Sequence, residues 1–165
     1  MKYSAPWWLP GGNLQTIWAA RLSRRFISLK PAFRRERWET PDKDFVDVDW
    51  LASQAGAHGS MNSKPAPLLV VFHGLEGSSE SHYAEALADA ARVRGWACAV
   101  PHFRGCSGEL NLAPRAYHSG DFEEIDWILK RLKSQHTGPV FGASSMLGAV
   151  KQLRSQSPST ALIAR

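Results

Sequence analysis

The stretch Leu68-Leu69-Val70-Val71-Phe72-His73-Gly74 decides the fold class of this 165-residue chain. An uninterrupted apolar run that ends at a His-Gly pair is typical of a strand buried on both faces of a sheet. Residues 96–103 and the pair Val140-Phe141 indicate two more such strands. The segments between them, residues 81–94 and 121–133, carry apolar side chains at helical spacing. This alternation predicts a parallel sheet with crossover helices, and the fold class is therefore α/β.

Two segments precede this alternation. Residues 35–51 contain two alternating runs divided by a Pro-Asp turn signal, which predicts a hairpin. The candidates for its buried faces are Phe45 or Val46, Val48 and Trp50. Residues 1–33 are rich in Trp, Pro, Gly and Arg, and we interpret them as an N-terminal arm that wraps the core, with a short helix near residues 14–22.

Composition excludes several classes of protein. With 44% apolar and 21% charged residues, the chain is globular in composition and long enough for one domain. No apolar run approaches the roughly 18 to 20 residues of a membrane span, and the first ten residues lack the apolar core of a signal peptide. Cys98 and Cys106 have no metal-ligand spacing. We therefore expect a cytoplasmic protein without metal or cofactor.

The net charge of +5 is unevenly distributed. The last acidic residue is Asp126, and residues 127–165 hold six basic residues and no acid. The first 126 residues are therefore nearly neutral, and the positive excess belongs to the end of the chain.

Three loops leave the carboxyl ends of the predicted parallel strands, where open α/β sheets gather their catalytic groups. The first is His73-Gly74-Leu75-Glu76-Gly77-Ser78-Ser79. Its glycines would let backbone N–H groups approach a bound oxygen, as an oxyanion hole requires. A tight turn without a catalytic part is the alternative interpretation.

The second loop follows residue 101 and is rich in polar side chains. Arg104 and His118 are candidates to line a site, although Arg104 also suits a salt bridge and His118 a loop hydrogen bond. Asp121 suits a helix N-cap, and Cys106 would need a nearby base to act as a nucleophile.

The third loop begins with Gly142-Ala143-Ser144-Ser145-Met146. A nucleophile elbow has the form Gly-x-Ser-x-Gly, and Met146 stands where the second glycine belongs. The spacing alone leaves two interpretations open, Ser144 as a nucleophile and Ser144 as a helix N-cap.

Several longer sequence motifs carry a family resemblance. They are Trp8-Leu9-Pro10-Gly11-Gly12-Asn13-Leu14-Gln15-Thr16, Arg35-Glu36-Arg37-Trp38-Glu39-Thr40-Pro41-Asp42, Asp47-Val48-Asp49-Trp50, the His73 loop continued to Tyr83, His102-Phe103-Arg104-Gly105-Cys106-Ser107-Gly108, and Arg115-Ala116-Tyr117-His118-Ser119-Gly120-Asp121. Over about residues 6–141 the chain resembles the N-terminal half of YheT-like α/β-hydrolases, which are related to the abhydrolase-domain esterases and lipases. Asn13 departs from the family, which usually has His there.

The resemblance implies a partial α/β-hydrolase fold and cleavage of carboxylic esters or lipids by a serine nucleophile. The residues that it assigns are Ser144 as the nucleophile, backbone groups of Gly74, Leu75 and Ser145 as the oxyanion hole, and His73, Glu76, Arg104 and His118 as site-lining candidates. In this fold the catalytic acid and histidine follow the serine. Here no acid follows Asp126 and no histidine follows His136. We therefore expect the chain to be inactive or severely impaired, unless upstream His73, His102 or His118 replaces the base, with Asp121 or Glu76 to orient it.

The resemblance ends near residue 141. Residues 142–165 hold five serines and no aromatic side chain, whereas all 17 aromatic residues precede them. We interpret residues 34–141 as hydrolase domain and residues 142–165 as an atypical tail from a frameshift or truncation. One edge of the sheet would then stay unpaired and prone to aggregation.

A function of another class is nucleic-acid binding by the basic arm. Seven basic residues lie between Arg21 and Arg37, interleaved with Phe26, Phe33 and Trp38. A solvated arm whose arginine stems pack on aromatic rings is the favoured interpretation.

Overall fold

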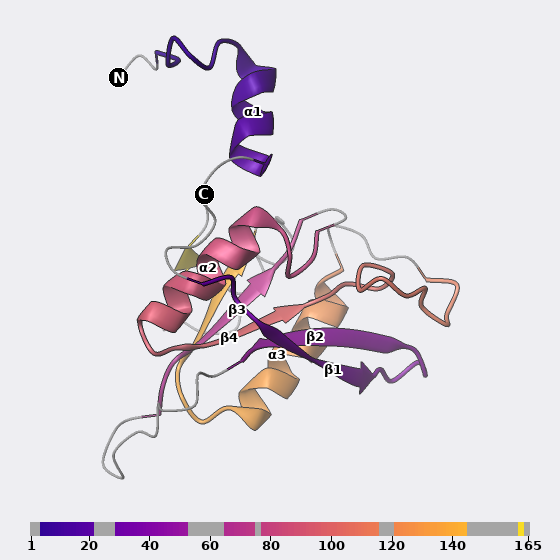
Figure 1. Ribbon diagram of the computed structural model, residues 1–165. Coiled ribbons are helices and arrows are strands. Elements are labelled where there is room, and N and C mark those ends of the chain that lie inside the picture. The colour runs from indigo at the N-terminus through magenta and orange to yellow at the C-terminus, as the bar shows by residue number, and fades with distance from the viewer. Residues whose placement is uncertain are drawn as a thin grey trace.

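The computed structural model describes residues 4–21, 29–52, 65–74, 77–115, 121–144 and 162–163. Their elements are α1 (Gly12–Arg21), β1 (Phe33–Glu39), β2 (Phe45–Leu51), β3 (Leu68–Phe72), α2 (His82–Val93), β4 (Ala97–Pro101), α3 (Phe122–Gln135), β5 (Val140–Ser144) and β6 (Leu162–Ile163). The strands form one sheet in the order β1-β2-β4-β3-β5-β6. Figure 1 shows this sheet with α2 and α3 on its two faces.

The centre of the sheet is the predicted parallel part. β3 lies between β4 and β5 and is parallel to both, with Leu69 opposite Cys98 on one side and Phe141 on the other. All five residues of β3 are buried. The continuous apolar run therefore marked a strand covered on both faces, and the α/β prediction is confirmed.

The two crossover helices bury alternate residues of β3. Leu68, Val70 and Phe72 share one core with the apolar face of α3, which includes Ile125 and Leu129. The residues between them, Leu69 and Val71, share the other core with α2 and with Cys98, Val100 and Ala143. Both helices were predicted within two residues of their bounds, because their apolar spacing of three and four matches the face that the sheet covers.

The predicted hairpin is β1 and β2, which pair antiparallel with Trp38 opposite Val46. β2 also pairs antiparallel with β4, so the hairpin extends the sheet at that side. Phe45, Val46 and Val48 are buried as predicted, while Trp50 is half-buried. The alternate residues of β2, Asp47 and Asp49, are buried as well, which the sequence interpretation missed.

The two ends of the chain differ from expectation. The predicted helix near residue 14 exists as α1, but it stands away from the sheet (Figure 1). Large apolar side chains of residues 4–21, including Trp7, are exposed, so in this described part the arm does not wrap the core. β6 pairs in parallel with Gly142 and Ala143 of β5. The expectation of an unpaired edge is therefore wrong at these two residues, because a short strand from the tail satisfies their backbone groups.

Candidate active site

The carboxyl ends of β3, β4 and β5 meet at one edge of the sheet, because the three strands are parallel. His73 follows directly after β3, His102 follows directly after β4, and Ser144 is the last residue of β5. Ser144 lies in register with Phe72. The three loops that the sequence singled out therefore start from this common edge.

Ser144 is half-buried at the end of its strand. A nucleophile elbow places its serine at such a strand end. Ser145 and the residues up to 161 lie outside the described part, so the turn that would follow the nucleophile and the predicted oxyanion donor at Ser145 remain predictions.

His73 is a framework residue at this edge. Its side chain is fully buried, Nδ1 lies 2.7 Å from the carbonyl oxygen of Gly74, and the N–H of Phe103 donates to Nε2 over 3.1 Å. Since Nε2 accepts, the ring proton sits on Nδ1 and the imidazole is neutral. Burial lowers the pKa of His73 to about 4. With both nitrogens engaged by backbone groups, this histidine ties the end of β3 to the residue after β4.

The glycine loop after His73 begins with a tight turn, in which the N–H of Gly77 donates to the carbonyl oxygen of Gly74 over 3.0 Å. The N–H of Gly74 donates to the hydroxyl oxygen of Tyr83 over 2.7 Å. A Cβ on Gly77 would come within 2.7 Å of that hydroxyl and 2.9 Å of the Cβ of His73. The N–H of Gly74 is thus used internally and does not fit the predicted oxyanion role. Leu75 and Glu76 lie outside the described residues.

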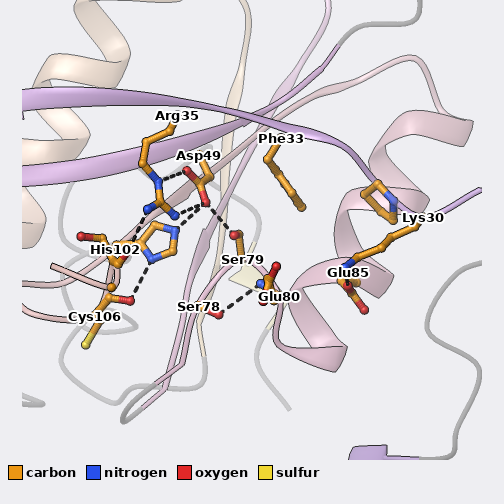
Figure 2. Close-up of a pocket in the computed structure, with 13 residues that line it drawn as sticks. Lys30, Phe33, Arg35, Asp49, Ser78, Ser79, Glu80, Glu85, His102 and Cys106 are labelled. Atoms are coloured by element: carbon orange, nitrogen blue, oxygen red, sulfur yellow. Dashed lines mark hydrogen bonds and ion pairs between the residues drawn. The ribbon is translucent and has the colours of Figure 1, made fainter.

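Asp49 connects the glycine loop to the rest of the edge (Figure 2). Its carboxylate accepts from Ser79 Oγ over 2.6 Å, from His102 Nε2 over 2.8 Å, and from both Nε and Nη2 of Arg35. Asp49, Ser79 and His102 are all buried. Burial alone would raise the pKa of Asp49, but the hydrogen bonds from Arg35, His102 and Ser79 outweigh it and hold the pKa well below its usual range.

This group contains a serine, a histidine and an aspartate, but not in the order of a catalytic relay. In a serine hydrolase the histidine lies between the other two and takes the serine proton. Here Ser79 donates to Asp49, and His102 donates to the same oxygen atom. The arrangement fixes the loop and provides no base for Ser79.

The sequence contains a signal for Asp49 in addition to its periodicity. Arg35 lies directly opposite Asp49 across the hairpin, and Arg37 lies directly opposite Asp47. Opposite charges at paired positions stabilise a hairpin, so Arg-x-Arg before the turn and Asp-x-Asp after it indicate two ion pairs. Arg37 Nε donates to Asp47 over 2.8 Å, in the same way as Arg35 to Asp49.

A cavity with a volume of about 740 Å³ lies beside Asp49. Arg35, Ser79 and His102 line it together with Lys30 and Glu85 (Figure 2). Ser144 and His73 do not. The cavity thus borders the outer part of the glycine loop and the hairpin, on the β2 side of the sheet.

Arg104 forms salt bridges, which is one of the two roles that the sequence suggested for it. Its Nε donates to Glu124 over 2.6 Å, and Nη1 donates to Asp44 and Asp42, each over 2.8 Å. Arg104, Asp44 and Glu124 are buried. Arg104 borders a smaller cavity of about 200 Å³, separate in its lining from the one beside Asp49. It therefore joins the hairpin turn to α3, and this contradicts its expected place in the lining of the site at the strand ends.

Asp121 occupies the N-cap position of α3, as predicted, but its side chain makes no capping hydrogen bond. Instead, Arg115 Nη2 donates to Asp121 Oδ1 over 2.6 Å. His118 lies outside the described residues, so its predicted role is not described.

Two further features concern ligands and membranes. Within the described ranges, no three His, Cys, Asp or Glu side chains gather in a way that could hold a metal ion. Among the same residues, no helix has the length and apolarity needed to cross a bilayer.

Cys98 is buried, which raises the pKa of its thiol to about 12.

No family model matches the chain, but individual proteins do. It is 47% identical to YheT of Escherichia coli K12, which is named as an esterase, over 74% of this chain and 34% of that protein. It is 28% identical to the phospholipase ABHD3 of Mus musculus over 78% of this chain and 32% of that protein. The chain therefore spans about a third of the length of these relatives.

Solved structures agree on the fold. A serine hydrolase without a lid from Xanthomonas campestris matches with a TM-score of 0.62 at 15% identity, over 84% of this chain and 62% of that one. A Pyrococcus furiosus esterase matches with a TM-score of 0.54 at 14% identity, over 80% of this chain and 49% of that one. Together with the sequence relatives, these matches show that the chain belongs to the α/β-hydrolase superfamily and carries part of a YheT-like hydrolase fold.

Proposed function

We propose that this chain carries the nucleophile strand and the oxyanion loop of a serine hydrolase that cleaves carboxylic esters, including acyl esters of lipids. The observation that carries the proposal is the position of Ser144 at the end of β5, at the edge from which the glycine loop starts. The substrate class follows from relatives named as an esterase and as phospholipases.

In this proposal the hydroxyl of Ser144 attacks the ester carbonyl, and backbone N–H groups at Leu75 and Ser145 bind the oxyanion. The hydrogen bond from the N–H of Gly77 to the carbonyl oxygen of Gly74 closes the turn at the start of this loop. Glu76 and His118 stay in the proposal as residues that line the site. His73 has a framework role, because both its ring nitrogens face backbone groups.

Among the residues that the structure describes, no histidine at this edge is free to serve as a base for Ser144. His73 and His102 are the described histidines at this edge, and the first is held by backbone groups while the second donates to Asp49. A serine without its histidine is a weak nucleophile, and the remaining acceleration is roughly 10³ to 10⁴ over water. We therefore propose that these residues alone are catalytically impaired, and that the acid and base come from the part that the longer relatives have in addition.

The location and the domain boundaries belong to the same proposal. We place the protein in the cytoplasm, with an arm over residues 1–33, hydrolase domain over residues 34–141 and an atypical tail over residues 142–165. The coding DNA tests the boundary at residue 142. If neither other reading frame beyond that point encodes a Gly-x-Ser-x-Gly elbow, a frameshift is excluded.

A chimera tests the function directly. Residues 1–144 are joined to the remainder of E. coli YheT, and hydrolysis of a p-nitrophenyl ester is measured together with fluorophosphonate labelling. We expect activity and labelling in the chimera, loss of both in its Ser144→Ala variant, and retention in Ser134→Ala, which removes an exposed serine of α3.

Two results would contradict the proposal. A folded chimera that neither turns over ester nor labels would exclude Ser144 as the nucleophile. Labelling of the 165-residue chain itself, abolished by Ser144→Ala, would show that a base is already present and would make the impaired-fragment part wrong.

A further inference from the structure

The hydroxyl group of Tyr83 lies against the turn at the start of the glycine loop. Its oxygen accepts a hydrogen bond from the N–H of Gly74 over 2.7 Å. A Cβ built on Gly77 would come within 2.7 Å of the same oxygen, so the hydroxyl is also close to the other end of this turn. One side-chain oxygen from α2 therefore lies close to both glycines.

The ring of Tyr83 is itself fixed from two sides. It packs against the core that contains Val71 and Ala143. These two residues lie opposite each other, one residue before the ends of β3 and β5. The ring of His82 meets the ring of Tyr83 edge to face, with centroids 5.3 Å apart. The position of the hydroxyl is thereby tied to the edge of the sheet at which Ser144 lies.

Gly74 is held through both of its peptide groups. Its N–H donates to Tyr83, while its carbonyl oxygen lies 3.0 Å from the donating N–H of Gly77 and 2.7 Å from Nδ1 of His73. Of these three contacts, the one with Tyr83 comes from outside the loop. A peptide bond is planar and trans, so the direction of a carbonyl fixes the opposite direction of the N–H that follows it. The contacts of Gly74 therefore orient the N–H that the proposed function uses to bind the oxyanion.

We propose that Tyr83 is a positioning residue for the oxyanion loop of the hydrolase. Its hydroxyl holds Gly74 so that the next N–H faces the oxyanion that forms when Ser144 attacks an ester. Tyr83 does not touch the substrate, and its effect comes through the backbone. The inference rests on the proposed function, because it needs a reaction that develops an oxyanion. A displacement of about 1 Å in such a group can slow a reaction about a hundredfold.

Amide hydrogen exchange of the 165-residue chain tests the hydrogen bond without any activity. Tyr83→Phe keeps the ring and removes the acceptor, so the amide hydrogen of Gly74 should exchange at least about tenfold faster. The amide of Val100, in the buried strand β4, should keep its wild-type rate and shows that the variant is folded. An unchanged rate at Gly74 would overturn the proposal.

Gly77→Ala provides a second variant in case Tyr83→Phe does not fold. The added Cβ meets the hydroxyl of Tyr83 and should push it away from Gly74 while the tyrosine itself is retained. Exchange at Gly74 should again become faster, and an unchanged rate in this variant would count against the proposal in the same way.

The chimera with E. coli YheT tests the effect on the reaction. Tyr83→Phe should lower kcat about ten- to hundredfold and leave KM within about twofold, because the oxyanion is absent from the bound ester. A trifluoromethyl ketone forms an adduct with the serine that carries the oxyanion, so its affinity should fall by the same factor as kcat/KM. A residue that only stabilises the fold would not change these two quantities in step.

The matched control is Ser81→Ala. The hydroxyl oxygen of Ser81 accepts from the N–H of Ser78 over 3.0 Å, which is the same kind of hydrogen bond but lies beyond the turn. Its loss should change kcat less than about threefold. Equal losses in Ser81→Ala and Tyr83→Phe would assign the effect to a general loosening of the loop and would overturn the specific role of Tyr83.

The failure of this inference and the failure of the proposed function give different results. An active wild-type chimera whose Tyr83→Phe variant keeps its kcat overturns the role of Tyr83 and leaves the proposed function intact. A folded wild-type chimera without activity contradicts the proposed function, and the catalytic role of Tyr83 falls with it. The exchange rate at Gly74 then still decides whether the hydroxyl holds the turn.

Discussion

Replacement of Asp49 by alanine should destabilise the protein strongly, because one carboxylate holds three separate parts of the fold. Asp49 accepts hydrogen bonds from Arg35 on β1, from Ser79 in the glycine loop, and from His102 after β4. Arg35 Nη1 also donates to the carbonyl oxygen of Ser107 over 2.6 Å. The variant removes the acceptor that these donors share.

The magnitude follows from the burial of each donor. Ser79 and His102 are buried, and a buried donor left without an acceptor costs about 1 to 3 kcal/mol. Arg35 is 43% exposed, so water replaces its partner and its share is about 0 to 1 kcal/mol. The unfolding free energy should therefore fall by about 2 to 7 kcal/mol, with roughly 4 kcal/mol as the central expectation.

Urea unfolding followed by circular dichroism at about pH 7 measures this loss. With a slope of about 2 kcal/mol per molar urea, the midpoint should fall by roughly 2 M. Glu109→Ala is the control, since it removes an exposed carboxylate that pairs with Arg37 over 3.0 Å on the same hairpin. That variant should lose less than about 1 kcal/mol. Equal effects of the two variants would refute the argument from burial.

The pH dependence gives a second check on Asp49. Its pKa in the folded protein is lowered from the ordinary value near 3.9, so its carboxylate stabilises the fold above that pH and ceases to do so as the pH falls further. The difference in unfolding free energy between wild type and Asp49→Ala should be constant from about pH 7 to about pH 5 and shrink below about pH 4. A difference that grows on acidification would contradict the assigned hydrogen bonds.

Three other variants test further buried contacts by urea unfolding. Arg104→Met leaves the buried carboxylates of Asp44 and Glu124 without their cation and should lower the unfolding free energy by about 3 to 5 kcal/mol. This loss should become smaller as the pH falls from about 4 to about 2, where Asp44 becomes protonated. Gly77→Ala should cost about 1 to 3 kcal/mol through crowding, whereas Gly12→Ala, whose added Cβ meets nothing within 4 Å, should be nearly neutral. In the wild type the neutral buried His73 should reduce stability by roughly 3 kcal/mol as the pH falls from about 6.5 to about 4. His73→Gln should lack that fall, and an unchanged pH profile would exclude the assigned burial.

The central strands and both crossover helices were predictable because hydrophobic burial decides them. Leu68 to Phe72 has no polar residue, and only a strand covered on both faces can hide such a run. The spacing of Ile125, Ile128, Leu129 and Leu132 likewise leaves one helical face to the core. These elements depend on local pattern and on apolar area, and both can be read from the chain without its partners.

The buried aspartates of β2 were not predictable from that pattern. Phe45-Val46-Asp47-Val48-Asp49 alternates, and alternation normally places the polar residues in water. The loop after β4 covers this face instead, since Arg35 bonds to Ser107 and Arg37 to Glu109. These contacts join residues 72 positions apart, so periodicity along one strand carries no information about them.

The difference between local sequence pattern and long-range contact also explains why the roles of the histidines at the strand ends were hard to assign. His73 and His102 stand where a hydrolase gathers its catalytic groups, yet their ring nitrogens hold backbone groups and Asp49. The described hydrogen-bond partners of His73 and Asp49 lie between Arg35 and Phe103 in the sequence. Tyr83, whose hydroxyl accepts a hydrogen bond from the N–H of Gly74, lies in the same range. The turn at the start of the oxyanion loop is therefore shaped by residues that precede the nucleophile strand. A base for Ser144 has to be a histidine whose ring nitrogens are not already used in these framework hydrogen bonds. The orientation of the glycine loop and the activation of the serine are therefore separable properties of the fold.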